Sequence, residues 1–454
     1  MKYMLRAAAG ATAMLAAMPL FSAPVMAGPA AAEIDRIDRL VMADSDRLTA
    51  IFKDIHQNPE LAFAETRTAG IVARELQALG FEVQTGIAET GVVGILRNGD
   101  GPVVMYRADM DANAVAEAND LPYKSTVRVT RDDGTEAPVA HMCGHDAHVT
   151  WMLGMARAMT QMKEAWSGTL VLVGQPAEEP ITGAQAMIDA GMYETHGVPK
   201  PDYFIGIHTA PLPVGTVVSA PGPLMAGTDQ VDILFKGIGG HGSMPQMTKD
   251  PVLMAALAVV EFQAIVSRTV TPQETAVLTV GSIQAGSDNN VIPATALLKA
   301  NLRWYSEATR QQMLRGIKSV SEGLARTYGM PEDQMPDITM KGSSTPLVND
   351  ADLSARLGGT LSDVLGEDAV IQSFPPATGS EDVHLLLGPH TDVPFTLLVV
   401  GVADPAAYRQ AVSEGKQFPF SAHNPNFMVD LKAIPEGTRV ATISVFDLMR
   451  PEAP

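Results

Sequence analysis

The sequence predicts an α/β protein in which a larger domain, built on a mixed sheet covered by helices, carries an inserted ferredoxin-like α+β domain. Helical and β-branched apolar segments alternate before Gly227. A strand-helix-strand-strand-helix-strand order then extends to Lys341, and helix and strand patterns resume from Ser343. With 454 residues, 46% apolar and 18% charged, the chain can bury more than one core.

The larger domain is expected to begin with two amphipathic helices, the second closed by Gly80. Its expected helices cover residues 33–63, 66–79, 149–163 and 435–449, and its expected strands cover 92–96, 103–106, 170–173, 203–207 and 395–401. The inserted domain is expected to have strands at 230–235, 276–283, 294–305 and 337–340 and helices at 251–267 and 309–328.

These patterns divide the chain into a larger domain at 28–226 and 342–454 and an inserted domain at 227–341. Residues 1–27 read as a signal peptide, with a short basic start, an apolar run and small residues before a cleavage site after Ala27 or Ala32. A retained anchor helix is the alternative, disfavoured by Pro19 and Pro24. We therefore expect an exported protein, periplasmic or secreted, without a membrane span after cleavage.

The net charge argues against polyanionic partners. The chain has 51 acidic and 32 basic residues, a formal charge of -19, and its basic residues form no cluster. Nucleic acid and anionic membranes would be repelled by such a surface.

The single cysteine, Cys143, lies in the octet His141-Met-Cys-Gly-His145-Asp-Ala-His148. A lone thiol forms no internal disulfide, so Cys143 is either a metal ligand or a nucleophile. An unpaired thiol in an oxidising compartment also needs protection, which a bound metal would provide.

Other polar clusters follow predicted strands, at 107–111, 175–179 and 207–209, where ligands gather in such sheets. Two divalent ions need about four to six protein donors. Candidate donors are Cys143, His145, Glu178, Glu179, His208 and His423. Neighbouring side chains diverge, so one of the two adjacent glutamates could ligate metal while the other acts as a general base.

A set of motifs resembles the dinuclear metallo-amidohydrolases of the aminoacylase and carboxypeptidase superfamily, in the branch of hippurate hydrolase and the indoleacetyl-amino-acid hydrolases. The motifs are His56-x-x-Pro-Glu60, Arg107-Ala-Asp-Met-Asp111, the octet at 141–148, Gln175-Pro-Ala-Glu-Glu179, Gly206-x-His208, Gly239-Gly-His241, Asn290-Val-Ile-Pro293, Gly379-Ser-Glu-Asp382 and His423-Asn-Pro-x-Phe427.

The resemblance implies a catalytic domain with two metals and a smaller domain that covers the site and forms a homodimer. It implies metal ligation by five residues, namely Cys143, His145, Glu179, His208 and His423. Glu178 would be the general base that generates a metal-bound hydroxide for attack on the amide carbonyl. The metals would be zinc or manganese, with cobalt or nickel as further candidates.

Five more residues receive roles from the same resemblance or from their chemistry. Asp109 would orient a ligand histidine from the outer shell. His241 would bind the carbonyl oxygen as it becomes an oxyanion, reaching in from the partner subunit. Asn290 would contact substrate, and Arg303 would hold a substrate carboxylate unless it forms a cross-strand ion pair. His56 is expected to be a structural histidine at a helix end.

The predicted activity is hydrolysis of the amide bond in N-acyl amino acids or similar small conjugates. The alternatives are an exopeptidase or dipeptidase of the same superfamily, a noncatalytic metal or ligand binder on this scaffold, and an amidase with Cys143 as nucleophile. Gly237-Ile-Gly-Gly-His-Gly242 matches a dinucleotide-binding pattern, but no helix starts directly after it, which argues against a nicotinamide enzyme.

Four segments depart from the family pattern near the expected pocket, one of them Val383-His-Leu385, which stands where relatives commonly have aromatic residues. Pro180-Ile-Thr182 replaces a run of glycines after the glutamate pair, a hydrophilic stretch at 130–135 precedes Cys143, and an extra loop is expected at 403–420.

Overall fold

The most apolar strands of the chain form the centre of an eight-stranded mixed sheet. The computed structural model describes residues 28–130 and 134–451, so the expected signal peptide lies outside the described residues. The sheet has the order β1 (Glu82–Ile87), β2 (Gly91–Asn98), β6 (Gly168–Gln175), β3 (Val103–Asp109), β7 (Tyr203–Pro213), β18 (Phe395–Ala403), β8 (Val217–Val218) and β17 (Val370–Ile371). The four central strands β6, β3, β7 and β18 are parallel; β6, β3 and β18 are almost wholly buried and β7 is buried over residues 204–207, as expected where helices cover both faces.

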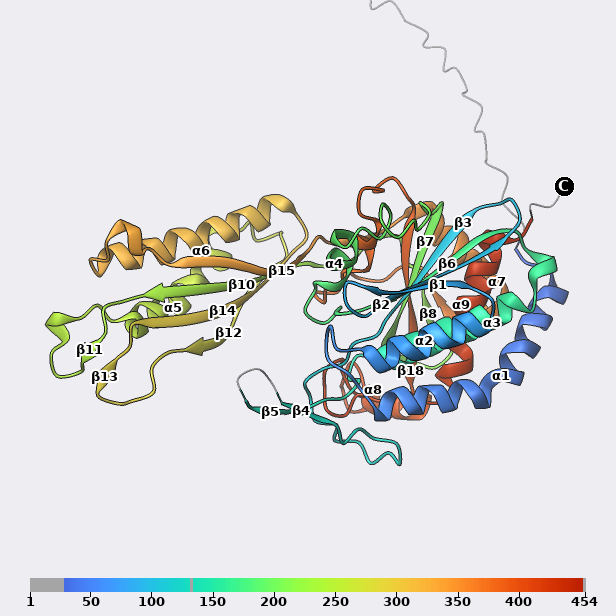
Figure 1. Ribbon diagram of the computed structural model, residues 1–454, viewed down its shortest axis with the longest axis horizontal. Coiled ribbons are helices and arrows are strands. Elements are labelled where there is room, and N and C mark those ends of the chain that lie inside the picture. Colours follow the sequence, from blue (N-terminus) through green and yellow to red (C-terminus); the bar gives the residue numbers. More distant parts are fainter. Residues whose placement is uncertain (1–27, 131–133, 452–454) are drawn as a thin grey trace, which may run out of the picture.

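Helices cover this sheet on both faces (Figure 1). One face packs against α1 (Ala31–Gln57), α2 (Thr66–Ala78), α3 (His145–Thr160), α7 (Ala351–Leu365) and α9 (Ala433–Met449). The other packs against α4 (Gly183–Asp189), the 3₁₀ helix η5 (Val383–Leu387) and α8 (Pro405–Ser413). Short elements complete this lobe: β4 (Arg128–Thr130), β5 (Glu136–Pro138), β9 (Gly222–Met225), β16 (Leu347–Asn349), η1 (Lys163–Ala165) and η4 (Glu367–Ala369).

The extra loop expected at 403–420 is partly wrong, because the segment contains α8. Asp404 caps this helix by accepting hydrogen bonds from the N–H groups of Ala406 and Ala407, and Pro405 occupies its first position. The helix has nine residues, too few for its apolar spacing to stand out from a loop.

The smaller lobe has the predicted ferredoxin-like fold. Its elements are β10 (Gly227–Lys236), α5 (Pro251–Thr269), β12 (Ala276–Gln284), β14 (Thr295–Trp304), α6 (Glu307–Thr327) and β15 (Asp337–Ser344), with the 3₁₀ helices η2 (Pro245–Met247) and η3 (Glu332–Gln334). The strands form an antiparallel sheet in the order β12-β14-β10-β15, and α5 and α6 pack on it around Phe235, Phe262 and Trp304. The expected boundary at residue 341 falls inside β15.

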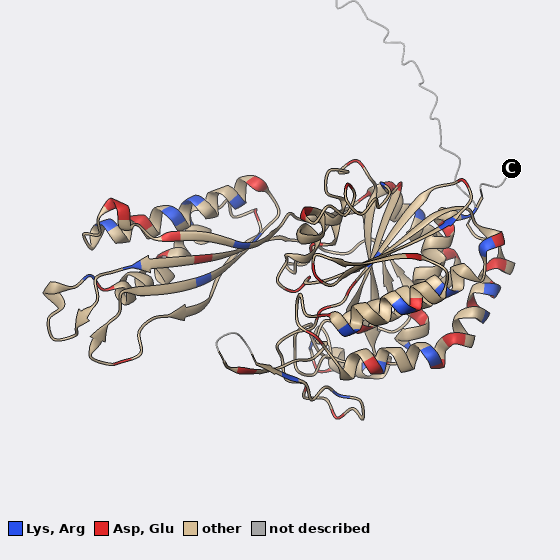
Figure 2. Ribbon diagram, viewed as in Figure 1, with Lys and Arg blue, Asp and Glu red and all other residues tan. Residues whose placement is uncertain are grey.

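Two short strands, β11 (Gly240–His241) and β13 (Val291–Ile292), pair at the end of the smaller lobe that points away from the larger one (Figure 1). In the described part of the chain, α5 is the one helix long and apolar enough to span a membrane. Its inner side, however, packs in the core of the smaller lobe through Met254, Ala258 and Phe262. Figure 2 shows Lys and Arg interspersed with Asp and Glu on α1 and α6.

Close packing of α9 on α3 fixes the helix that begins at the ligand motif. A Cβ on Gly437 of α9 would lie 2.1 Å from the indole ring of Trp151 in α3. Trp151 is fully buried and donates its indole N–H to the carbonyl of Ala433. The missing side chain at 437 is therefore what lets the two helices meet.

We predict that Gly437→Ala lowers the free energy of unfolding by about 1–3 kcal/mol, because the added methyl overpacks this contact. Denaturant unfolding measures the change. Gly323→Ala is the matched control, because Gly323 is exposed in α6 with no atom within 4 Å of the new Cβ. Equal stability of the two variants would contradict the proposed role of the contact.

Candidate metal centre

The sheet places the candidate ligands at one edge. Asp109 ends β3, Glu178 and Glu179 follow β6, and His208 lies in β7. Cys143 and His145 stand at the start of α3, and His423 lies between α8 and α9. Residues far apart in the sequence therefore meet where parallel strands end, the usual ligand position in such sheets.

Gly144 allows the start of α3 to approach β7. Its φ is +88°, in the left-handed region, and a Cβ there would lie 2.7 Å from the side chain of Thr209. Only glycine satisfies both conditions without strain or displacement. Thr209 in turn donates its hydroxyl to the carbonyl of Cys143. The position of Cys143 thus depends on its glycine neighbour.

Two histidines present one ring nitrogen each to the site. His145 donates Nδ1–H to the backbone carbonyl of Asp111 at 2.8 Å, and His208 donates Nδ1–H to the carbonyl of Thr209 at 2.7 Å. Nε2 of His208 lies 3.6 Å from the sulfur of Cys143. A backbone partner on the far nitrogen is the usual arrangement for a metal-ligating histidine.

The donor atoms converge as a divalent ion would require. Ligand atoms of Cys143, His145 and Glu179 lie within 4.8 Å of one another. Nε2 of His145 and Oε1 of Glu179 are buried and, among the described residues, have no hydrogen-bond partner. Buried polar atoms normally have partners, so these two are suited to ligate a divalent ion. The thiolate, imidazole and carboxylate set suits zinc and neighbouring transition metals.

His423 closes the exposed side of this group. Its Nε2 lies 3.2 Å from Oε2 of Glu179, and 54% of its side chain is exposed. Its backbone is left-handed, with a φ of +61°, and is held by a hydrogen bond from its N–H to the carbonyl of Met142. A non-glycine residue in this conformation is strained, and such strain clusters at ligand sites.

Electrostatics favour a thiolate at the centre. Burial and the charge of Glu179 raise the pKa of Cys143, but His208 and His145 outweigh them and lower it to about 6. Burial lowers the pKa of His208, yet Cys143 raises it to about 9. Contacts with Cys143 and Glu179 raise the pKa of His423 to about 10. The thiolate of Cys143 and the imidazoles of His208 and His423 therefore stabilise one another's charged forms.

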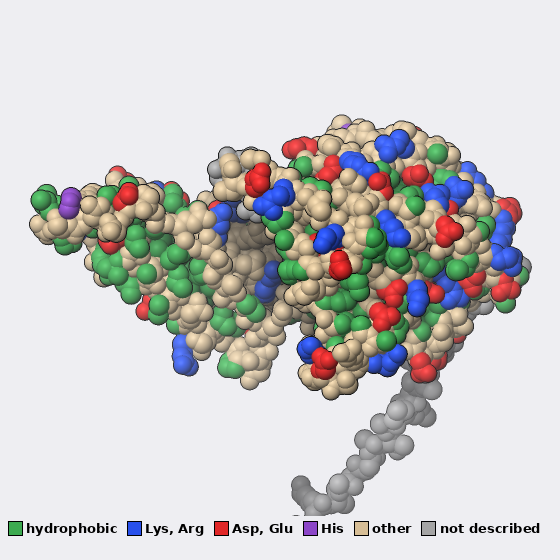
Figure 3. Space-filling view, turned by 90° about the horizontal axis from the view of Figure 1, so that it is seen from below, with side chains coloured by type: hydrophobic (Ala, Val, Ile, Leu, Met, Phe, Trp, Pro, Cys, Tyr) green, Lys and Arg blue, Asp and Glu red, His purple; other side chains and the backbone are tan. Residues whose placement is uncertain are grey.

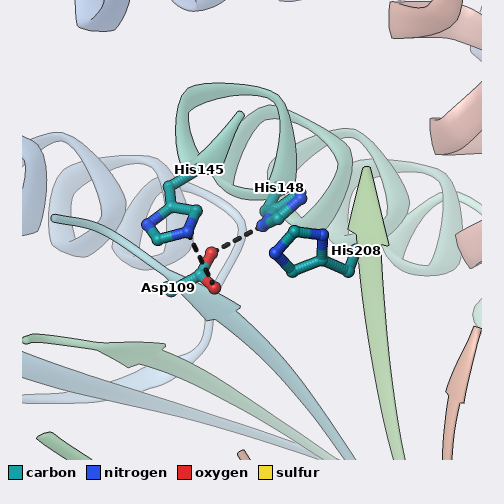
Figure 4. Close-up of side chains that lie close together, drawn as sticks. All are labelled: Asp109, His145, His148 and His208. Atoms are coloured by element: carbon teal, nitrogen blue, oxygen red, sulfur yellow. Dashed lines mark hydrogen bonds and ion pairs between the residues drawn. The ribbon is translucent and has the colours of Figure 1, made fainter. Parts of the chain in front are cut away.

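Asp109 acts through a residue that the sequence left without a role. Its Oδ1 accepts Nδ1–H of His148 at 2.6 Å, and Nε2 of His148 accepts the N–H of Thr209, the neighbour of His208 (Figure 4). Nε2 of His145 is 3.5 Å from the other oxygen of Asp109. Both nitrogens of His148 are engaged, so it supports the ligand strand and is unavailable to metal.

A buried guanidinium lies beneath the centre. Arg107 donates to Gln175, Asp109 and Glu381, at 2.8, 2.7 and 2.8 Å, and its Nη2 is 3.5 Å from Asp382. All of these side chains are buried. Their motifs were visible in the sequence, but their mutual contacts join strands and loops that local patterns do not connect.

Glu178 stands beside the ligands and is also buried. Its Oε2 lies 3.7 Å from Nε2 of His145. Burial, Glu381 and Glu179 raise its pKa well above the ordinary value of a glutamate. A carboxyl in this environment holds a proton more readily than an exposed glutamate, which suits a group that takes up and then releases a proton.

The smaller lobe contributes one of its three candidate residues to this centre. Arg303 donates to Asn301 and to Ser380 of the larger lobe at 2.7 and 2.5 Å, and no ion pair to it occurs among the described residues. Burial lowers its pKa, and the charge of Glu178 opposes that shift. Arg303 is thus bound to the residue before Glu381, and among the described residues it forms no cross-strand ion pair.

His241 and Asn290 lie elsewhere. They are exposed on the paired segments at the far tip of the smaller lobe, where the N–H of Gly242 donates to the carbonyl of Asn290. Nδ1 of His241 accepts the N–H of Ser243 at 3.1 Å, so a neutral ring carries its proton on Nε2. Within one chain they do not reach the centre (Figure 1).

His56 is the structural histidine that the sequence predicts. It lies buried at the end of α1 and binds Asp146 at 2.6 Å and Glu117 at 3.2 Å. Desolvation lowers its pKa, but these acids raise it to about 9. Its contact with Asp146 supports the residue after ligand His145.

The chain is similar to known metal-dependent hydrolases. The family model of peptidase family M20/M25/M40 matches residues 105–443. The chain is 33% identical over 399 residues to IAA-amino acid hydrolase ILR1-like 4 of Arabidopsis thaliana, covering 86% of this chain and 83% of the relative. It is 40% identical over 276 residues to the hippurate hydrolase of Campylobacter jejuni, covering 60% and 68%.

A solved structure has a similar fold. The YXEP protein of Bacillus subtilis, described as a dinuclear metal binding peptidase, superposes with a TM-score of 0.65 at 27% identity, covering 89% of this chain and 98% of that one. The match of the family model includes Cys143, both glutamates, His208 and His423. The chain belongs to peptidase family M20/M25/M40.

Proposed function

We propose that the protein hydrolyses the amide bond of N-acyl amino acids or similar small conjugates with two divalent metal ions. Family membership supports a metal-dependent amidohydrolase. The observation that carries the proposal is the pair Glu178 and Glu179, in which the carboxylate of Glu179 joins the ligand cluster and that of Glu178 lies beside it, 3.7 Å from Nε2 of His145. A noncatalytic binder would need Glu179 but not Glu178.

Divalent ions at this site would acidify a water and polarise the substrate carbonyl. The chain supplies the proton transfers. Glu178 takes a proton from the attacking water and returns it to the amine nitrogen as the C–N bond breaks, giving a carboxylic acid and a free amine. Its raised pKa suits both steps.

Substrate orientation is assigned to Arg303. Its guanidinium is partly buried, bound to Ser380 at the mouth between the lobes, and within the field of Glu178. A guanidinium is suited to gripping a carboxylate through two parallel hydrogen bonds. This grip favours substrates with a free carboxylate beside the scissile amide, which N-acyl amino acids and peptides share. An exopeptidase or dipeptidase is therefore the second candidate.

The site is completed by a second copy of the chain. His241 offers an Nε2–H donor suited to an oxyanion, yet it lies at the far tip of its own smaller lobe. The outer side of α5 and the free edge strand β12 expose apolar side chains, with Leu253 44%, Val260 66% and Ile283 51% exposed. Figure 3 shows hydrophobic side chains gathered over this lobe and a recess between the lobes. Such a surface and open edge suit a homodimer.

We also propose export to the periplasm or the medium through the basic-apolar start of the sequence. In that compartment a bound metal would keep the thiolate of Cys143 from oxidation. Cell fractionation with N-terminal sequencing tests the assignment, and full-length protein confined to the cytoplasm would exclude it.

The activity is tested with N-acyl amino acids compared against free dipeptides. We predict that Glu178→Gln lowers kcat about 10²–10⁴-fold, because the proton carrier is lost, while bound metal stays unchanged. Steady-state kinetics and metal analysis provide the two measurements. Full turnover by Glu178→Gln would show that the base is misassigned, and faster cleavage of free dipeptides would favour the second candidate.

Chelation separates the metal mechanism from a thiol mechanism. We predict that removing divalent ions abolishes hydrolysis and that zinc, manganese, cobalt or nickel restores it, the most effective ion being read from titration. Activity that survives complete metal removal would favour Cys143 as a nucleophile.

Mixing two inactive variants tests the shared site. Glu178→Gln and His241→Ala are each predicted to be inactive, but their mixed dimer has one site with an intact Glu178 from one copy and His241 from the other. Random exchange should therefore restore about a quarter of the wild-type sites. Absence of any recovery after subunit exchange, confirmed by native mass spectrometry, would place His241 outside the site.

A further inference from the structure

The loop that carries both glutamates is held by two other buried carboxylates. Three successive backbone N–H groups donate to them. The N–H of Ala177 donates to Glu65 at 2.8 Å, and those of Glu178 and Glu179 donate to the two oxygens of Asp111 at 3.1 and 3.0 Å. Glu65 and Asp111 are both fully buried. Hydrogen bonds to ionised carboxylates are stronger than bonds between neutral groups, so three of them in succession fix this backbone.

The loop needs such support because its backbone is strained. Ala177 has a φ of +50° and Ile181 a φ of +57°, both in the left-handed region that residues with a Cβ avoid. The branched side chain of Ile181 makes its position especially unfavourable. Strained backbone persists only where its surroundings hold it. Released from the carboxylates, the loop would move the base and the ligand together.

Asp111 also contacts His145, another candidate ligand. Its backbone carbonyl accepts Nδ1–H of His145 at 2.8 Å, and its Oδ1 lies 3.4 Å from the same nitrogen. One residue at the end of β3 therefore orients a histidine from α3 and two glutamates that follow β6. None of these contacts requires Asp111 to touch metal or substrate.

We propose that Asp111 is a positioning residue that fixes Glu178, Glu179 and His145 in mutual register, with Glu65 supporting the same loop from its other end. The proposal rests on the proposed function of this site. It assigns Asp111 no proton transfer and no metal ligation.

The hydrogen-bond chemistry of the two carboxylates differs, and the difference gives a sharp test. Both oxygens of Asp111 accept from backbone N–H groups, so an asparagine amide there would point an NH₂ at a donor. Glu65 accepts two N–H groups, of Phe63 and Ala177, on one oxygen, and its other oxygen meets the hydroxyl of Thr90. A glutamine at 65 can keep the first pair and donate to the hydroxyl.

Asp111→Asn is therefore expected to lower kcat about 10–100-fold with KM changed less than about threefold, and to weaken metal affinity by a similar factor. Glu65→Gln is expected to lower kcat less than about threefold, although it removes the same charge. Stopped-assay kinetics give the first comparison. Zinc competition against a chromophoric chelator gives the second, independent of turnover.

A carboxylate of purely structural use provides the matched control. Glu60 accepts the N–H groups of Arg67 and Thr68 at 2.8 Å each, at the start of α2 and away from the ligands. Glu60→Gln is expected to lower the melting temperature without changing kcat or zinc affinity of the folded protein. If Asp111→Asn behaves as Glu60→Gln does, the positioning role is wrong.

Relieving the backbone strain at Ala177 should partly rescue Asp111→Asn. Glycine adopts the left-handed conformation at position 177 without penalty, so Ala177→Gly should recover part of the kcat and zinc affinity lost by Asp111→Asn. If neither Asp111→Asn nor the double variant folds, Asp111 serves the fold and the proposal is overturned. Loss of zinc affinity in Asp111→Asn, together with a wild-type protein inactive on every amide, would refute the proposed function but leave the positioning role standing.

Discussion

A buried cation makes the rest of this centre possible. Arg107 lies at the floor of the site between Asp109, Glu381 and Asp382, with every one of these side chains out of contact with water. Burying a carboxylate without a partner is strongly unfavourable, and several together would repel one another. The guanidinium offsets part of that cost on its side, and the divalent ions offset it on the other. The acids at the strand ends are thus layered between two sources of positive charge.

The candidate ligand histidines are in turn held by hydrogen bonds to residues behind them. Backbone carbonyls of Asp111 and Thr209 accept hydrogen bonds from the Nδ1–H groups of His145 and His208. His148 links Asp109 to β7, because it donates to Asp109 and accepts from the N–H of Thr209. These contacts leave the ligand atoms themselves free. Precision at the centre therefore comes from groups that do no chemistry, which is the general design of metal sites.

Long, strongly periodic segments were predicted from sequence, because their apolar spacing matches the faces they bury, although the first helix ends at Gln57 rather than at residue 63. The ferredoxin-like lobe is the clearest case, since its strands alternate and both of its helices are long. The short helix α8 was missed, although Asp404 and Pro405 signal its start. The polar edge strand β1 was missed because it has one buried residue, Ile87, to mark it.

The candidate ligands were recognisable from motifs, but the division of labour among neighbouring side chains was not. Within the octet, α3 places His145 toward the centre and His148 one turn further on, against Thr209. The motif resemblance made His145 a ligand and gave His148 no role, but residue type and spacing alone do not separate these two histidines. The partners of Asp111 were equally hidden, because its oxygens bind backbone N–H groups 67 and 68 positions away, whatever side chains those residues carry.

The position of β18 has a consequence for how the molecule is made. This strand lies between β7 and β8, yet the whole smaller lobe separates it from them along the chain. During synthesis the smaller lobe is complete while β7, which carries His208, still has an unpaired edge. Unpaired strand edges in partly folded chains are prone to associate with other chains. Only when β18 inserts and His423 follows can all the candidate ligands meet, so the candidate metal centre is among the last parts of the protein to form.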